Sequence, residues 1–171
     1  MLNVGTIGTS WITEQFIQAL KLTGRYHIKG IYSRNAKNAR DIAKFYQADY
    51  YCDQLNNLLY DPAIDVIYVA SPNSLHYQYA KEAIRAGKHV IVEKPAFASV
   101  SEWYQIHQYA EQQGVKVFEA ALHYHNRNYR RLRQLVRNLQ KGHSQPFLGA
   151  NFNIGQYSSR YEQYIQAMAG Q

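Results

Sequence analysis

The feature that most constrains the fold is a repeated alternation of short apolar segments with longer segments of helical period. The apolar segments are LNVGTIG (2–8), YHIKGIYS (26–33), DVIYVA (65–70), HVIVE (89–93) and VKVFEA (115–120). Such near-continuous apolarity is typical of strands that are buried on both faces of a parallel sheet. The chain is therefore expected to contain a parallel sheet covered by helices.

Between these segments, apolar residues recur at the spacing of one helix face. Four such stripes are Ile12, Phe16, Ile17 and Leu20; Ala36, Ala39, Ala43 and Tyr46; Leu75, Tyr79, Ala83 and Ile84; and Val100, Trp103, Ile106 and Ala110. Gly24, Gly87 and Gly114 each follow a stripe, where a left-handed residue commonly ends a helix. Strand, helix, glycine and strand in repetition predict an α/β fold with a doubly wound parallel sheet over residues 1–121.

The pattern changes after Ala121. A predicted helix has apolar residues on one face and arginines on the other, and a strand-like segment, FLGANFNI (147–154), follows it. The apolar residues are Tyr129, Leu132, Leu135, Val136 and Leu139, and the arginines are Arg127, Arg130, Arg131, Arg133 and Arg137. We interpret residues 122–171 as the partial start of a second domain.

Composition narrows the class of protein. With 46% apolar and 18% charged residues, intrinsic disorder is excluded as the main state. The single cysteine, Cys52, has no partner for an internal disulfide, and no apolar stretch approaches the ~20 residues of a membrane span. We therefore predict a cytoplasmic protein without membrane segments. The net charge of +7 attracts anions in general and does not choose among them.

The glycine turn GTIGTSWIT (5–13) lies where a strand meets a helix, as at the phosphate-binding end of a dinucleotide fold. In the register of the G-x-G-x-x-G fingerprint, Gly8, Ser10 and Thr13 occupy the glycine positions, so one glycine of three is present. Backbone around Gly8, Thr9, Ser10, Trp11 and Ile12 would then bind a pyrophosphate, and the Ser10 hydroxyl could cap the helix or donate to phosphate. The alternative is an ordinary turn and N-cap.

The end of the second predicted strand bears on cofactor choice. NAD-preferring sites usually place an acidic residue there to bind the ribose 2′-hydroxyl, but residues 15–40 contain no Asp or Glu. Instead, Ser33, Arg34 and Lys37 lie where a 2′-phosphate would bind, and the Arg34 guanidinium could stack on adenine. NADP(H) is the preferred cofactor and NAD(H) stays possible. The alternative is a solvated basic loop.

A longer motif set follows. The strand after residue 65 ends in Ser71, Pro72 and Asn73, with His76 three residues later; the next helix ends in Ala86, Gly87, Lys88 and His89; and the next strand ends in Glu93, Lys94 and Pro95. With GTSWIT, YSR, FEAALHYHNRNY and QYSSRY, these motifs resemble the Gfo/Idh/MocA family of NAD(P)-dependent oxidoreductases over essentially the whole chain. The resemblance implies a Rossmann domain at 1–121 and the beginning of an α+β open-sheet domain at 122–171.

The resemblance also implies site roles. Ser71 to Asn73 and Glu93 to Pro95 would border the nicotinamide ribose, with a cis Lys94–Pro95 peptide. Lys94 would be catalytic, because an ammonium there can hydrogen-bond a substrate hydroxyl or carbonyl and move its proton while hydride passes to or from the nicotinamide. The alternative for Lys94 is a surface cation. His76 could contact the cofactor or substrate, or cap the following helix.

The segment at His123 and His125 departs from the Tyr-Arg-Phe-His-Pro of many relatives, so no role is transferred to these histidines. As a strand, the segment would put both on one face. A third metal ligand at convincing spacing is lacking, and we predict no metal site.

For function, we expect hydride transfer between NADP(H) and a sugar, polyol or related hydroxy or carbonyl compound. Family members continue into a substrate domain with an Asp and His pair that completes proton transfer, and a full-length form is expected to be a homo-oligomer. Nothing after Arg160 offers that pair, so we expect a truncated chain whose competence as an enzyme is open. The alternatives are a non-catalytic or regulatory nucleotide-binding module and, less favoured, nucleic-acid binding through the basic helix at 127–141.

Overall fold

The computed structural model describes residues 1–141. In chain order the strands are β1 (Leu2–Ile7), β2 (Tyr26–Tyr32), β3 (Tyr50–Cys52), β4 (Val66–Val69), β5 (His89–Val92) and β6 (Val117–Glu119). The helices are α1 (Trp11–Thr23), α2 (Ala36–Tyr46), α3 (Leu55–Leu59), α4 (His76–Arg85), α5 (Val100–Gln112) and α6 (Arg127–Lys141). Two 3-10 turns, Asn73–Leu75 and Leu122–His125, precede α4 and α6.

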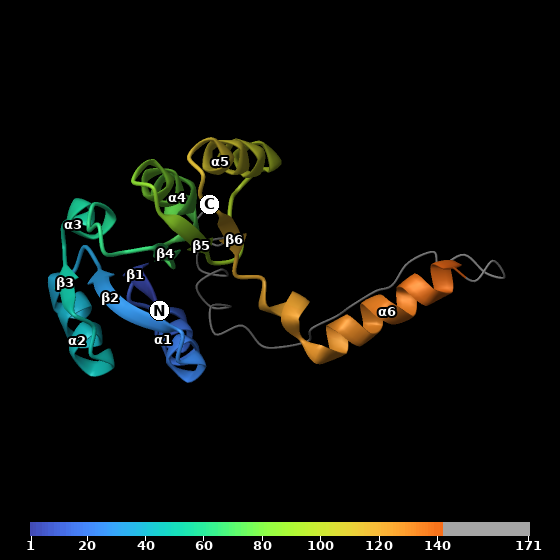
Figure 1. Cartoon of the computed structure of the whole chain (residues 1–171), viewed down its shortest axis with the longest axis horizontal. Helices are drawn as coiled ribbons and strands as arrows, with labels where there is room; N and C mark the ends of the chain where they lie inside the picture. Colours follow the sequence, from blue (N-terminus) through green and yellow to red (C-terminus); the bar gives the residue numbers. More distant parts are fainter. Residues whose placement is uncertain (142–171) are drawn as a thin grey trace, which may run out of the picture. The chain divides into compact units, whose positions relative to one another are not determined.

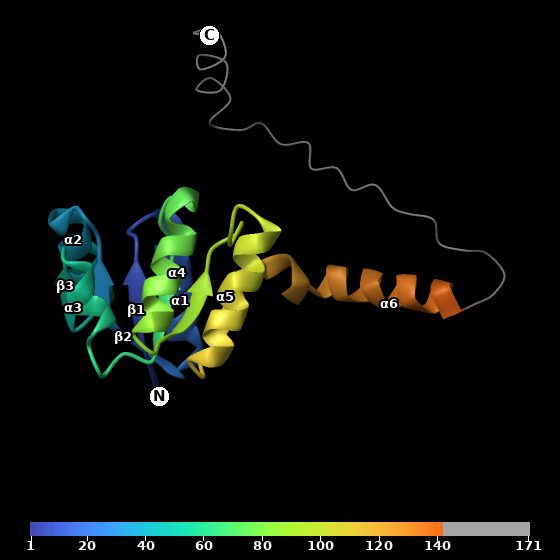
Figure 2. The same ribbon diagram turned by 90° about the horizontal axis from the view of Figure 1, so that it is seen from above.

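Within the described residues the strands form one parallel sheet in the order β3-β2-β1-β4-β5-β6 (Figures 1 and 2). The predicted doubly wound parallel sheet is therefore confirmed. The direction of winding reverses between β1 and β4, which are neighbours in the sheet although β2 and β3 lie between them in the sequence. Ligands of open α/β sheets bind at the carboxyl ends of the strands beside this reversal.

Helices cover both faces of the sheet (Figure 1), and each face has its own core. On one face, α1 and α2 pack through Ile17, Leu20, Ala39 and Ala43. On the other, α3, α4 and α5 pack through their own apolar residues, which include Leu58, Ala80, Ile84, Ile106 and Ala110. The predicted stripes thus face the sheet, with one exception: Val100, at the first turn of α5, is 71% exposed.

The sequence pattern did not indicate β3 and α3. β3 has three residues and pairs only with β2 in the described sheet, and α3 has five residues. Elements this short cannot show a period, so only packing against β2 and the rest of the core defines them.

The glycines after the helices adopt the predicted left-handed conformation. Gly24, Gly87 and Gly114 have φ angles of 63°, 74° and 70°. α2 ends differently, because Gln47 takes the left-handed position with a φ of 58°.

By contacts, the chain groups into two units, residues 1–123 and 124–171. The described part of the second unit is the end of the 3-10 turn and α6, which begins where the sequence predicts the basic helix. The strand-like segment 147–154 lies outside the described residues. The division into domains 1–121 and 122–171 therefore stays a prediction.

Candidate functional site

The segments singled out from the sequence all follow the carboxyl ends of strands in the first unit. Gly8 follows β1, Ser33 follows β2, Ser71 lies two residues after β4, and Glu93 follows β5. Backbone hydrogen bonds continue the strand pairing into these segments, from Gly8 N to Tyr32 O at 3.0 Å and from Glu93 N to Val69 O at 2.9 Å. The sheet therefore brings residues from distant parts of the sequence to one edge.

Gly8 lies directly after β1, close to the backbone that follows β4. Its φ is 116°, and a Cβ built there would lie 2.4 Å from the carbonyl oxygen of Ala70. No side chain fits in that space, because the obstacle is backbone. The first fingerprint glycine permits a tight turn, and Gly8 makes that turn next to the reversal of the sheet.

Ser10 is the N-cap of α1, as the alternative interpretation of this turn expected. Its backbone is extended and its carbonyl accepts from Thr13 N at 2.9 Å, but its hydroxyl makes no capping hydrogen bond. The hydroxyl is therefore not used by the helix. Thr9 and Ile12 are half-buried, and Trp11 is 71% exposed at the first position of α1. The amino end of a 13-residue helix thus faces the edge where an anion would bind.

Ser33, Arg34 and Lys37 lie between β2 and the first turn of α2, next in the sheet to the Gly8 turn. The Ser33 hydroxyl accepts from Asn35 N at 3.2 Å, and the Asn35 side chain caps α2. Arg34 is exposed and, among the described residues, forms no ion pair or hydrogen bond. Lys37 is exposed, and its Nζ lies 3.7 Å from Oδ2 of Asp41. Hydrogen bonds of Ser33 and Asn35 hold the loop, and the Arg34 side chain is left available to bind an anion.

The Glu93–Lys94–Pro95 segment is held from two sides. The Lys94–Pro95 peptide is cis, as the resemblance implied. Glu93 is buried; its Oε1 accepts the Tyr68 hydroxyl at 2.6 Å and its Oε2 accepts Lys94 N at 3.1 Å. Lys94 itself is exposed. The backbone of Lys94 is fixed while its ammonium group reaches solvent on the site edge.

Two residues of this arrangement were not found from the sequence. Tyr68 lies within the otherwise aliphatic strand β4, and its ring stacks on Phe16 with 3.7 Å between centroids. Burial, and then the hydrogen bond to Glu93, raise the pKa of Tyr68, so it stays a hydrogen-bond donor. Glu119, at the end of β6, accepts Ala96 N at 3.1 Å. A buried tyrosine in an apolar strand needs a hydroxyl partner, and that was the available signal.

Ser71, Pro72 and Asn73 lie after β4, where Ser71 is half-buried and the other two are exposed. His76 begins α4 and is buried, and both of its ring nitrogens lie at backbone carbonyl oxygens of other segments. The ring therefore does not cap α4, since a cap accepts from helix N–H groups.

The Ala86–His89 motif has a structural role. Lys88 is buried, and its Nζ donates to the carbonyl oxygens of Asp61 at 2.7 Å and Ile64 at 2.8 Å. His89 Nδ1 accepts from Lys116 N at 3.0 Å. Both residues lie at the amino end of β5, opposite the predicted site. Their hydrogen bonds connect neighbouring segments at that end of the sheet.

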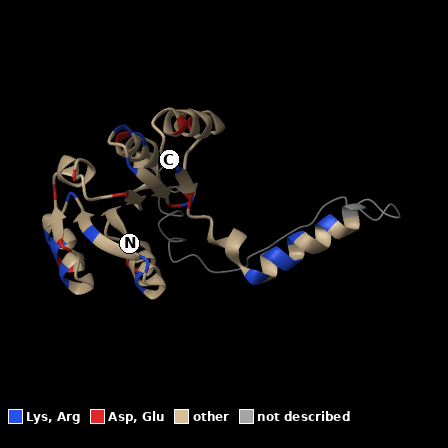
Figure 3. Ribbon diagram, viewed as in Figure 1, with Lys and Arg blue, Asp and Glu red and all other residues tan. Residues whose placement is uncertain are grey.

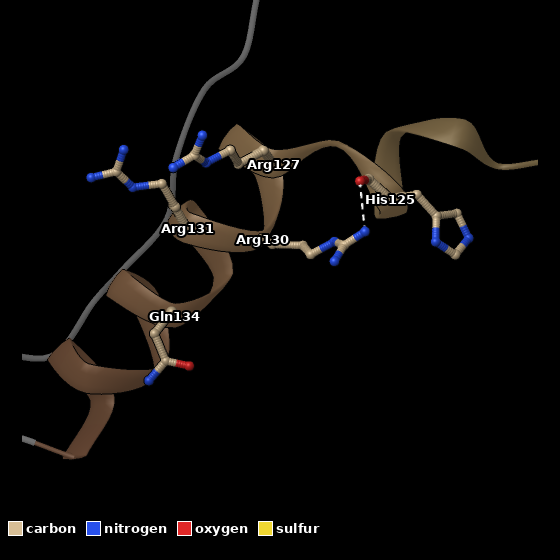
Figure 4. Close-up of a pocket in the computed structure, with 5 residues that line it drawn as sticks. All are labelled: His125, Arg127, Arg130, Arg131 and Gln134. Atoms are coloured by element: carbon tan, nitrogen blue, oxygen red, sulfur yellow. Dashed lines mark hydrogen bonds between the residues drawn. The ribbon is translucent and has the colours of Figure 1, made fainter.

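In the second unit, the first turns of α6 gather positive charge (Figure 3). A hollow there is lined by His125, Arg127, Arg130, Arg131 and Gln134 (Figure 4), and Arg130 donates to the His125 carbonyl at 3.0 Å. His123 and His125 lie in a 3-10 turn and are exposed, so the strand arrangement considered for them is wrong.

Among residues 1–141, no group of three or more His, Cys, Asp or Glu side chains could hold a metal ion. None of the helices in that range is long and apolar enough to cross a membrane.

The chain is similar to known oxidoreductases along almost its whole length. It is 33% identical to the uncharacterized oxidoreductase YgjR of Escherichia coli and 29% identical to the NADP(+)-dependent scyllo-inositol 2-dehydrogenase IolU of Bacillus subtilis, each over 96% of the chain. These alignments cover 49% and 48% of the relatives, so the chain spans about half the length of the curated relatives it matches.

A crystal structure of an NAD-binding oxidoreductase from Klebsiella pneumoniae superposes with a TM-score of 0.75 at 28% identity, covering 82% of this chain and 40% of that one. The profile of the Gfo/Idh/MocA oxidoreductase family, described by its NAD-binding Rossmann fold, matches residues 2–121. This match contains the glycine turn, the Ser71–Asn73 and Glu93–Pro95 segments and the whole described sheet, and it identifies the chain as a member of the Gfo/Idh/MocA oxidoreductase family.

Proposed function

We propose that residues 1–121 bind NADP(H) in preference to NAD(H). We further propose that the protein is an oxidoreductase that transfers hydride between this cofactor and a sugar, polyol or related compound. The observation that carries the cofactor preference is the loop after β2. It offers the Ser33 hydroxyl and the exposed guanidinium of Arg34, which is unpaired among residues 1–141, and residues 15–40 supply no carboxylate for a ribose 2′-hydroxyl. An arginine fork matches phosphate geometry better than it matches a hydroxyl.

The cofactor would lie across the reversal of the sheet. Gly8 to Ile12 would bind the pyrophosphate with backbone N–H groups at the start of α1, and Ser10 would add its free hydroxyl. Ser71 to Asn73 and Glu93 to Pro95 would border the nicotinamide ribose. The nicotinamide supplies hydride transfer, and Lys94 would hydrogen-bond the substrate oxygen and hold or accept its proton.

The proposed substrate class rests on the family and on the relative IolU, whose name gives an inositol as substrate and NADP(+) as cofactor. The chain spans about half the length of such relatives. That these residues catalyse the reaction is therefore proposed together with the substrate class. Turnover measured with NADP⁺ and a panel of sugars and polyols tests it. Cofactor binding without turnover favours the second candidate, a non-catalytic nucleotide-binding module. Such a module would use the same residues at the carboxyl ends of the strands.

The cofactor preference is tested by fluorescence titration of the full chain with NADPH and NADH. We expect NADPH to bind at least about tenfold more tightly, and Arg34→Ala to remove most of that difference while weakening NADH binding far less than NADPH binding. The matched control is Arg25→Ala, which removes the same charge just before β2, at the opposite edge of the sheet. Equal affinities in the wild type, or tighter NADH binding, would contradict the assignment.

The basic helix α6 suggests nucleic-acid binding only through its charge. Its arginines are not interleaved with aromatic residues in a stacking pattern, and an amphipathic helix with a basic outer face is usually solvated. Binding of duplex or single-stranded DNA that weakens steeply with salt would support this alternative.

A further inference from the structure

His76 connects the two segments that border the proposed nicotinamide site. The residue is 1% exposed. Its Nδ1 lies 3.0 Å from the carbonyl oxygen of Pro95, and its Nε2 lies 2.9 Å from the carbonyl oxygen of Ser71. Ser71 lies just after β4, and Pro95 directly follows Lys94. One buried ring therefore spans from the Ser71 segment to the Lys94 segment.

Both partners of the ring are acceptors. A carbonyl oxygen cannot donate, so each contact is a hydrogen bond only where the ring nitrogen carries a proton. Neutral imidazole carries one such proton and imidazolium carries two. The arrangement is fully satisfied only when both nitrogens donate.

Carboxylates hold the backbone on each side of Pro95. Lys94 N donates to Glu93, and Ala96 N donates to Glu119. The Pro95 carbonyl is therefore presented to His76 by a backbone that is hydrogen-bonded on both sides.

We infer that His76 is a positioning residue that donates from both ring nitrogens and so fixes the Lys94 segment relative to the Ser71 segment. Lys94 is then held on both sides, since its own N–H is bonded to Glu93 and the next carbonyl is bonded to His76. The separation of the two segments sets the width of the nicotinamide site. The expected effect of His76 on cofactor binding rests on the proposed function. The hydrogen bonds of the His76 ring do not depend on that function.

The ring geometry is tested without any ligand. In ¹⁵N-labelled full chain near neutral pH, the His76 side-chain signals are assigned by their loss in His76→Gln. We expect two protonated nitrogens of similar chemical shift. One protonated and one bare nitrogen would overturn the double donation and with it the inference, whether or not the chain binds a dinucleotide.

The binding consequence is tested with two probes: NADPH, and adenosine 2′,5′-bisphosphate, which carries the adenine half without nicotinamide. We expect His76→Ala to weaken NADPH binding about tenfold and to leave the bisphosphate unchanged, with His76→Gln, which keeps one donor group, in between. The matched control is His107→Gln on α5, whose ring lies tilted against Trp103 and contacts neither segment in the hydrogen bonds described.

The outcomes separate the two proposals. A wild-type chain that binds neither probe refutes the proposed function, and the nitrogen signals alone then decide the inference. A wild type that binds both, with His76→Ala losing both equally or neither, overturns the positioning role, because a purely structural loss would not distinguish the nicotinamide half from the adenine half.

Discussion

Replacement of Gly8 by alanine probes the close approach on which the site depends. The new Cβ would lie 2.4 Å from the carbonyl oxygen and 2.9 Å from the carbonyl carbon of Ala70, at a φ of 116°. Ala70 is itself bonded to β1, because its N–H donates to Ile7 O at 2.8 Å. The clash therefore falls on the joined backbones of two central strands and cannot be relieved by rotating a side chain.

The magnitude follows from comparison with Gly24, which also has a positive φ, 63°, but has no atom within 4 Å of an added Cβ. Gly24→Ala costs only the left-handed backbone, about 1 kcal/mol. Gly8→Ala carries at least that strain and adds overpacking against backbone, typically about 1–3 kcal/mol. We expect Gly8→Ala to destabilise the chain by about 3 kcal/mol, roughly 2 kcal/mol more than Gly24→Ala.

Urea unfolding followed by far-UV circular dichroism measures both variants against the wild type, and NADPH titration of the folded variants follows. Gly8→Ala should shift the unfolding midpoint strongly and weaken NADPH binding, whereas Gly24→Ala should leave binding unchanged. A difference between the two free energies of unfolding below about 0.5 kcal/mol would refute the reasoning, since the backbone contact would then carry no measurable cost.

Three further predictions address single residues. Lys94→Met is expected to abolish any turnover found in the substrate panel and to change NADPH affinity by less than about threefold, because only the ammonium is lost; normal turnover contradicts its role. Lys88→Met removes the donor to the carbonyls of Asp61 and Ile64, of which the Asp61 carbonyl keeps the Ile64 N–H, and should lower the free energy of unfolding by about 1–3 kcal/mol in urea, against little change for exposed Lys44→Met. Burial, with Tyr79 beside it, raises the pKa of Tyr32 from 10.0 to about 12. The unfolded chain thus loses this proton first, so the stability that Tyr32 contributes is present below pH 10 and is lost as pH rises toward about 12. Tyr32→Phe should flatten that alkaline loss in urea midpoints, and an unchanged slope would count against the shift.

The prediction of the strands and long helices from sequence succeeded because burial imposes a period on the residues themselves. β4 is buried at every position, β1 and β2 are buried toward their carboxyl ends, and the glycines after α1, α4 and α5 have the left-handed angles expected of them. β3 and α3 escaped because three or five residues cannot display a period. Val100 was misplaced because a first-turn residue can lie beyond the packed face.

The sequence predicted which segments form the candidate site, but not which of their atoms are in contact. Gly8, Ser33, Ser71 and Glu93 each follow the carboxyl end of a strand, and parallel strands place such ends at one edge, so their grouping follows from the order of the strands. Ser10 is an N-cap by its backbone, as one alternative expected, but the hydroxyl cap that the sequence allowed is not formed, because that depends on the path of the backbone. The predicted roles of these residues await the titrations above.

By itself, the sequence determined the fold class and the family, because a buried parallel sheet and a closely spaced motif set leave their mark on local residue order. The contacts that hold the Lys94 segment, in contrast, arise from the fold. Tyr68 reaches Glu93 across 25 positions and His76 reaches Pro95 across 19, so neither pair has a local signature. Hydrogen bonds of buried groups depend on which atoms the fold brings within reach, and the sheet order β1-β4-β5 sets that distance.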